Sequence, residues 1–200
     1  MDPAKGNCWR SGKLSPQGFR FVKGYEGYAY NEYKDSEGYR TICYGITYHG
    51  EQDIFNQLKE LEPVPETYGA QAGYVTFNKR YGAPIKDICI NELKLTKQYQ
   101  FDAIVSLCFN AGVGVITNRK STLYNRIKAN INDREGITEA FKMWVYGDDP
   151  SQPLPGLVAR REEEAKMFFG EVVKYRPIQV INGKGVIETN KGNGWLPDKC

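Results

Sequence analysis

The sequence predicts a mainly helical α+β fold, with a small lobe built around an antiparallel β-hairpin and a second, helical lobe. Two segments rich in aromatic and branched residues, 29–34 and 39–44, flank the turn-forming sequence DSEG at 35–38. In the second half of the chain, apolar residues recur at helical spacing in several short segments. At 200 residues the chain is long enough for a substantial core, in one domain or in two closely packed lobes.

The first expected element is a helix that begins at Ser15 and runs to about Glu26. Ser15 suits the N-cap, Pro16 suits the first turn, and Gly27 suits a left-handed stop after the helix. Glu26 therefore lies at a helix C-terminus, where the macrodipole disfavours a negative charge by about 0.3–1 kcal/mol. A residue placed at a cost in stability suggests a function, although an ordinary surface glutamate is an open alternative.

The hairpin that follows carries Asp35 and Thr41. Asp35 at the first position and Gly38 at the fourth position suit a type I turn, so Asp35 has a purely structural interpretation as the cap of its own turn. Thr41 is of a type that is common in strands. Taken singly, each of these residues is explained by structure at least as well as by function.

Beyond the hairpin, a short amphipathic helix is expected over 51–61, ended by Pro63 and Pro65. A loop-like stretch that contains Gly69 and Gly73 is expected to follow. The remaining elements are expected to be four short helices and a final small hairpin, over 98–110, 121–129, 136–144, 157–169 and 178–187.

The composition excludes several classes of protein. Apolar residues make up 40% of the chain, and 27 basic residues face 24 acidic ones, as in an ordinary soluble globular protein. The formal net charge of +3 favours approach to an anionic polymer such as the bacterial cell wall, but it is too small for a typical nucleic-acid binder. Residues 1–13 contain no apolar run, so neither a signal peptide nor a membrane span is expected there.

Five cysteines with no close pair argue against a disulfide framework and against zinc, and predict reduced, mostly buried thiols. A bond between Cys8 and Cys200 stays open, because the ends of a chain often lie near each other. The single histidine, His49, argues against histidine-based metal sites and against nucleophiles that need a histidine base. Carboxylates therefore remain as the groups for acid–base chemistry.

Glu26, Asp35 and Thr41 have the spacing of three residues in a known family, and around them the chain resembles the phage-type lysozymes, the endolysin family that includes the T-even phage lysozyme. In that family a helix ends in Glu-Gly, a hairpin turn has the pattern Tyr-x-Asp-x-x-Gly, and Thr-Ile-Gly-Tyr-Gly-His follows. The matching sequences in this chain are EG at 26–27, YKDSEG at 33–38 and TICYGI at 41–46.

Later blocks resemble the helical lobe of the same family, at 100–114, 121–123 and 154–162. The resemblance spans about 14–169, is weak over 48–93 and does not cover the last thirty residues. Cys43 stands where the family usually has glycine, and Ile46 where it usually has histidine. That histidine is mainly a structural ion-pair partner in the family, so its replacement concerns local packing more than catalysis.

By this resemblance, Glu26 is the general acid that protonates the leaving oxygen of a glycosidic bond. Asp35 stays ionised, stabilises the oxocarbenium-like transition state and helps to activate a water that Thr41 positions. The implied substrate is peptidoglycan, cut between N-acetylmuramic acid and N-acetylglucosamine with inversion, which needs carboxyl groups roughly 6.5–9.5 Å apart. The resemblance implies neither a metal nor an organic cofactor.

The resemblance also implies substrate contacts by Thr47, Phe109, Asn110 and Ser121. From the residues alone, core packing explains Phe109 equally well, and helix capping is the alternative for Asn110. Arg160 and Arg161 have two open interpretations: they hold Glu26 or a neighbouring acid in place, or they pair along the helix surface with the glutamates that follow them.

Residues 1–170 are expected to form a lysozyme-like catalytic domain, with a small β-containing lobe over about 14–92 and a helical lobe over about 93–170. Residues 171–200 are expected to be a C-terminal extension of unknown role, packed on the surface or mobile rather than bound to the cell wall. The protein is expected to be a monomer that binds peptidoglycan and no nucleic acid. It is expected to be made in the cytosol and to act at the cell wall or in the periplasm after release.

Two alternative functions remain open at this point. A lytic transglycosylase needs the glutamate but not the other two residues, so Asp35 and Thr41 favour hydrolysis. A non-catalytic wall-binding or tail module would keep the fold without the chemistry. The sequence does not distinguish a free endolysin from a virion-borne lysozyme or a bacterial effector.

Overall fold

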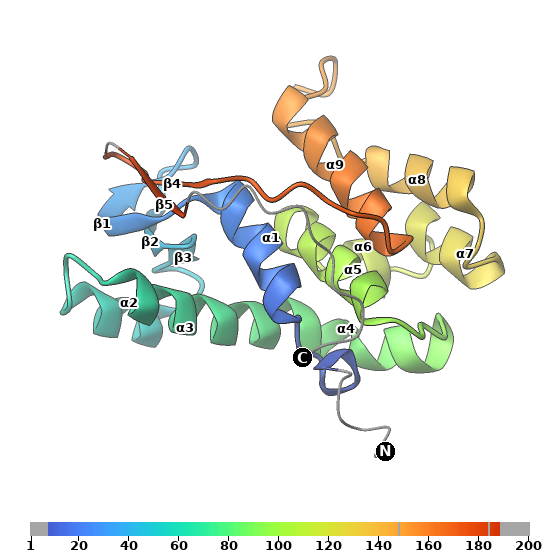
Figure 1. Ribbon diagram of the computed structural model, residues 1–200, viewed down its shortest axis with the longest axis horizontal. Helices are drawn as coiled ribbons and strands as arrows, with labels where there is room; N and C mark the ends of the chain where they lie inside the picture. The colour runs from blue at the N-terminus through green and yellow to red at the C-terminus, as the bar shows by residue number, and fades with distance from the viewer. Residues whose placement is uncertain (1–7, 148, 184, 189–200) are drawn as a thin grey trace. The chain divides into compact units, whose positions relative to one another are not determined.

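The computed structural model describes residues 8–147, 149–183 and 185–188 (Figure 1). These residues are mostly helical with small antiparallel sheets, which confirms the predicted fold class. The elements follow in the order η1 (Cys8–Ser11), α1 (Pro16–Glu26), β1 (Ala29–Lys34), β2 (Arg40–Cys43), β3 (Ile46–Thr47), α2 (Gln52–Lys59), α3 (Glu66–Phe77), η2 (Asn78–Gly82), α4 (Ala83–Asp87), η3 (Ile88–Glu92), α5 (Gln98–Ala111), α6 (Gly114–Thr117), α7 (Thr122–Ala129), α8 (Arg134–Lys142), α9 (Pro155–Phe168), β4 (Ile178–Gln179) and β5 (Val186–Glu188).

The described chain divides into two compact units. A helical unit contains the described residues up to Gly18 together with 80–174. A β-containing unit contains 19–79 together with the described residues from Tyr175 onward. The segment after residue 174 therefore belongs with the sheet and with most of α1, although the sequence places it more than a hundred residues later.

The β-containing unit is built on a three-stranded antiparallel sheet in the order β1-β2-β3. Tyr33 is paired with Thr41, and Thr41 is paired with Thr47 on its other side. Because directly opposed residues of antiparallel strands share one face of the sheet, these three side chains form a single row. The predicted hairpin is confirmed, with Gly38 at a φ of +81° in its turn, whereas β3 was not predicted.

The loop expected around Gly69 and Gly73 is wrong, because both residues lie inside helix α3. A Cβ on Gly69 would come within 2.6 Å of the Tyr28 ring, and one on Gly73 would lie 3.4 Å from the Phe19 ring. The two glycines are four residues apart and therefore share one face of the helix. They allow the helix to approach aromatic residues closely, which sequence reasoning mistook for a turn signal.

In the helical unit, the structure confirms the predicted cap of α1 at Ser15. The same side chain also hydrogen-bonds to α5. Ser15 Oγ accepts a hydrogen bond from the Gly18 amide at 3.0 Å and donates to Asp102 Oδ2 at 2.5 Å. The Ser15 amide and Gln98 Nε2 donate to Asp102 Oδ1 at 3.0 and 2.7 Å. Despite these donors, complete burial raises the pKa of Asp102 to about 7.

Three of the cysteines, Cys43, Cys89 and Cys108, are free and buried, as predicted. The pairing considered for Cys8 and Cys200 lies outside the described side chains. No described helix is both long enough and apolar enough to cross a membrane. Among the same described residues there is no group of three or more histidine, cysteine or acidic side chains that could hold a metal ion.

The final hairpin is also confirmed, as β4 paired with β5. Gln179 and Ile181, within and just after β4, hydrogen-bond to the backbone of Tyr28. The described part of the extension therefore packs against the β-containing unit. Residues 189–200 of this extension lie outside the described residues.

Asp102→Asn is expected to remove a pH dependence from the stability of the protein. Between about pH 4 and 7 the buried Asp102 holds its proton in the folded state, whereas the unfolded chain releases it, so the free energy of unfolding falls as the pH rises through this range. The asparagine keeps the shape without titrating. Urea unfolding from pH 4 to pH 8 measures the difference, with the exposed Asp87→Asn as control; equal slopes in all three proteins would contradict this account.

Candidate active site

Glu26 is the last residue of α1, as predicted from the sequence. The chain leaves the helix through Gly27, which has a φ of +71° and donates its amide to the Lys23 carbonyl at 3.1 Å. Glycine adopts a positive φ more easily than other residues, so Gly27 ends the helix directly after Glu26. The Glu26 side chain is half-buried at this helix end.

Asp35 both caps its turn and faces Thr41. Its Oδ1 accepts the amides of Glu37 and Tyr39 at 3.0 and 2.9 Å. Its Oδ2 accepts the hydroxyl of Thr41 at 3.1 Å. The structural interpretation from the sequence is therefore right for one oxygen of Asp35, while the other oxygen is held by the second candidate residue of the hairpin.

Thr41 is 2% exposed, and its single hydroxyl proton has two acceptors within reach. Thr41 Oγ1 lies 3.1 Å from Asp35 Oδ2 and 3.1 Å from the Tyr39 carbonyl oxygen. A hydroxyl donates one hydrogen bond and accepts up to two, so Oγ1 keeps acceptor capacity for a further donor such as water.

Tyr33 is the residue that connects both candidate carboxylates electrostatically. Burial raises the pKa of the Tyr33 hydroxyl, and the negative charges of Asp35 and then Glu26 raise it further. The two acids therefore act on one hydroxyl group of the same unit. Sequence reasoning noted Tyr33 only as part of the hairpin motif, although its position two residues before Asp35 places it on the same side of the strand.

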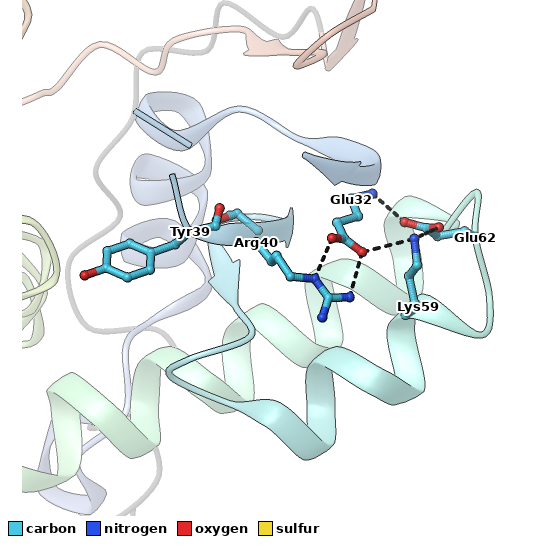
Figure 2. Close-up of polar contacts among 6 residues, drawn as sticks. Glu32, Tyr39, Arg40, Lys59 and Glu62 are labelled. Atoms are coloured by element: carbon cyan, nitrogen blue, oxygen red, sulfur yellow. Dashed lines mark hydrogen bonds and ion pairs between the residues drawn. The ribbon is translucent and has the colours of Figure 1, made fainter. Parts of the chain in front are cut away.

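The opposite face of the hairpin carries an ionic network rather than candidate chemistry (Figure 2). Arg40 makes two hydrogen bonds to the Glu32 carboxylate, at 2.6 and 3.0 Å, and these are the largest cause that lowers the pKa of Glu32 to about 2. Lys59 bridges Glu32 and Glu62 at 3.1 and 2.6 Å. Figure 2 shows the Tyr39 ring directed away from this network. The network ties the hairpin to the end of α2.

Thr47 lies beside Thr41 in the row across the sheet and is half-buried. Its hydroxyl accepts the Gly50 amide at 3.1 Å, which closes the turn before α2. Near it, the single histidine, His49, lies against the exposed ring of Tyr39 with ring centroids 6.0 Å apart and nearly parallel planes.

The two residues that depart from the family motif have clear local roles. Cys43 adopts a φ of +55°, a left-handed conformation that favours glycine, which accounts for the usual glycine at this position. Burial raises the pKa of the Cys43 thiol to about 11. Ile46 is 1% exposed and pairs with Ile42 between β2 and β3, so an apolar contact occupies the place of the family's histidine.

The other expected substrate-binding residues, Phe109, Asn110 and Ser121, belong to the helical unit. The half-buried Phe109 ring packs edge-on against Tyr81, with centroids 5.2 Å apart. Asn110 is exposed at the last turn of α5, and its Oδ1 accepts a hydrogen bond from Arg161 at 3.0 Å. Ser121 Oγ donates to the Val115 carbonyl at 2.6 Å. The cap of α5 is Gly112 rather than Asn110.

Arg160 and Arg161 do pair with a glutamate of their own helix, but inside the unit rather than on its surface. Glu164 is fully buried and forms ion pairs with Arg160 at 3.1 Å and with Arg161 at 2.8 Å. Ser106 Oγ donates to the same carboxylate at 2.6 Å. Because Arg161 also binds Asn110, this buried cluster fixes the side chain of one candidate substrate-binding residue.

Comparison with known proteins gives consistent matches. Residues 23–164 match the family described as phage lysozyme. An endolysin of Acyrthosiphon pisum secondary endosymbiont phage 1 is 30% identical over 159 residues, covering 78% of this chain and 97% of that protein. A SAR-endolysin of Enterobacteria phage P21 is 28% identical over 144 residues, covering 72% of this chain and 77% of that protein.

Solved structures agree with these sequence matches. An endolysin from Escherichia coli O157:H7 phage FAHEc1 has a TM-score of 0.56 and 26% identity, covering 78% of this chain and 92% of that one. The muramidase domain of SpmX from Asticcacaulis excentricus has a TM-score of 0.59 at 24% identity, covering 78% of this chain and 97% of that one. At that identity the second likeness supports the fold alone.

Removal of either carboxylate is expected to lower the pKa of Tyr33. Asp35→Asn should have the larger effect, Glu26→Gln the smaller, and the double variant the largest, because both charges oppose ionisation of the hydroxyl. Ultraviolet titration of tyrosinate measures this, with Tyr33→Phe to assign the signal and Asp53→Asn as a control. A Tyr33 pKa unchanged in the double variant would rule out the arrangement described here.

Proposed function

Because this chain belongs to the phage lysozyme family, it is a peptidoglycan-degrading lysozyme, and we propose that it hydrolyses the β-1,4 bond between N-acetylmuramic acid and N-acetylglucosamine with inversion. The observation that supports this most is the geometry of the hairpin, where the Thr41 hydroxyl lies 3.1 Å from Asp35 Oδ2, in the same compact unit as Glu26 at the end of α1. Glycoside hydrolysis by inversion needs two carboxyl groups and a positioned water.

In this proposal Glu26 is the general acid. It donates its proton to the glycosidic oxygen as the bond to the anomeric carbon breaks. Its position suits this role, because Glu26 is the last residue of α1 and its side chain is half-buried there. The leaving sugar departs with a neutral hydroxyl group, and Glu26 becomes a carboxylate.

Asp35 and Thr41 act on the water that replaces the leaving group. Asp35 Oδ1 is committed to two backbone amides, which keep the carboxylate oriented, while Oδ2 faces the threonine hydroxyl. A water held between Oδ2 and Thr41 Oγ1 attacks the face opposite to the leaving oxygen and transfers a proton to Asp35. Attack from that face inverts the anomeric centre.

The remaining roles are proposed on the family resemblance. Thr47, Phe109, Asn110 and Ser121 contact the sugar chain, within a catalytic domain that comprises residues 1–170. The protein acts as a monomer at the cell wall, with no metal, organic cofactor or nucleic-acid partner. The hydrogen bonds of Asn110 and Ser121 to their own unit do not prevent these contacts, because each side chain keeps further hydrogen-bonding groups.

A lytic transglycosylase is the alternative enzyme, and the hydrogen bond between Asp35 and Thr41 favours hydrolysis over it. A transglycosylase would let the substrate close on itself, so its products end in anhydro-muramic acid. Mass spectrometry of digested peptidoglycan distinguishes the two reactions: hydrolysis gives reducing ends, and anhydro-muropeptides as the main product would overturn our assignment.

Glu26→Gln is expected to lower kcat by about 10²–10⁴-fold, the usual contribution of a general acid. Clearing of outer-membrane-permeabilised cells and release of reducing sugar from purified peptidoglycan measure the loss. Glu37→Gln, at an exposed acid of the neighbouring hairpin turn, is the matched control and should keep wild-type activity. Equal activity of both variants would remove Glu26 from the mechanism and support the reading of a non-catalytic role.

Thr41→Val is expected to lower kcat by about 10–100-fold, because it removes the hydrogen bond to a charged carboxylate while keeping the shape of the side chain. Thr41→Ser retains the hydroxyl and should recover most of the activity. Proton NMR of the first-formed product gives the anomeric configuration in the same experiment. A β-product formed first would show retention and exclude the positioned water.

A further inference from the structure

A segment beyond the family match runs along helix α1. Residues 175–181, here called the strap, follow the 23–164 match and belong to the β-containing unit. Arg20 donates from Nη1 to the Arg176 carbonyl at 3.0 Å. The Arg176 guanidinium lies over the Tyr25 ring, 4.3 Å from its centroid. The strap is therefore joined to α1 by both main-chain and side-chain contacts.

Two glycines, Gly24 within α1 and Gly27 directly after it, allow the strap to approach the helix closely. A Cβ on Gly24 would lie 2.8 Å from the Arg176 carbonyl oxygen, and one on Gly27 would lie 2.9 Å from the Gln179 carbonyl oxygen. Together with Arg20, these residues recur every three or four positions and therefore lie along one side of the helix. The strap follows that side from the middle of α1 to its end.

The strap also pairs with the backbone just after Glu26. The Tyr28 amide donates to the Gln179 carbonyl at 2.8 Å, and the Ile181 amide donates to the Tyr28 carbonyl at 2.9 Å. These bonds form a parallel bridge between Tyr28 and Val180. Glu26 thus has strap contacts at the residue before it and at both residues after it.

We propose that the strap positions Glu26 for catalysis, which adds residues 175–181 to the catalytic domain proposed above for residues 1–170. The inference rests on the proposed role of Glu26 as the general acid. The last turn of a helix has carbonyl groups without partners inside the helix and frays easily. Strap contacts on both sides of Glu26 hold that turn, and a displacement of about 1 Å in such a group can reduce the rate by about 10²-fold.

Gly24→Ala tests the proposal, because two effects predict opposite results. Alanine stabilises an isolated helix relative to glycine, so a strap without function leaves activity unchanged or improved. A Cβ at this position presses on the Arg176 carbonyl, so the strap proposal predicts a loss of kcat of tenfold or more, with KM within about twofold of wild type. Gly24→Leu has a larger side chain and should lower kcat further, again with little change in KM.

The matched control is Gly156→Ala, at a helical glycine of α9 whose Cβ would meet nothing within 4 Å. It should keep wild-type kcat and KM. Hydrogen exchange of the Tyr28 and Ile181 amides in each full-length variant reports whether the strap is in place. Circular dichroism shows whether the helices are retained.

The proposal is overturned if amide exchange shows a released strap while kcat stays at the wild-type value. It is also overturned if both Gly24 variants keep the two amides protected, because the close contact would then not exist. Glu26→Gln separates this test from the proposed function. An inactive Glu26→Gln beside a fully active Gly24→Leu with a released strap rejects the strap alone, whereas a fully active Glu26→Gln rejects the acid itself.

Discussion

A slip of one residue between β1 and β2 would turn Thr41 away from Asp35 and bring Arg40 or Ile42 into its place, because neighbouring residues of a strand point to opposite faces. The candidate chemistry of the β-containing unit depends on this register. The register is held from the opposite face of the hairpin, where Arg40 pairs with Glu32 and Lys59 pairs with the same carboxylate. Ion pairs outside the candidate site thus help to align the side chains within it.

Features with a local cause were predictable from the sequence. The cap at Ser15, the stop at Gly27 and the turn that starts at Asp35 depend on residue types with restricted hydrogen bonding or unusual φ angles, and the structure contains each of them. Gly69 was misread because the missing side chain that suits a turn also lets a helix approach Tyr28 closely. A single sequence does not show whether a glycine serves a turn or a close contact between a helix and its neighbour.

Features that depend on contacts between distant residues were not predictable. A run of three glutamates after two arginines indicates an exposed helix, yet Glu164 is completely buried with Arg160 and Arg161. Burial of such a carboxylate is tolerated only when several donors surround it, and one of these donors is Ser106, which comes from α5. The electrostatic role of Tyr33 likewise depends on a charge from α1 as well as on one from its own hairpin.

The pairing of Tyr28 with Gln179 and Ile181 has a consequence for the order of events during synthesis. The partner of the backbone beside Glu26 is made about 150 residues later. Until residue 181 has left the ribosome, the end of α1 lacks these two hydrogen bonds, however well the earlier residues have folded. Contacts of such long sequence separation form slowly and late. An enzyme that attacks the envelope of bacteria is in this way completed only after nearly all of its described chain has been translated.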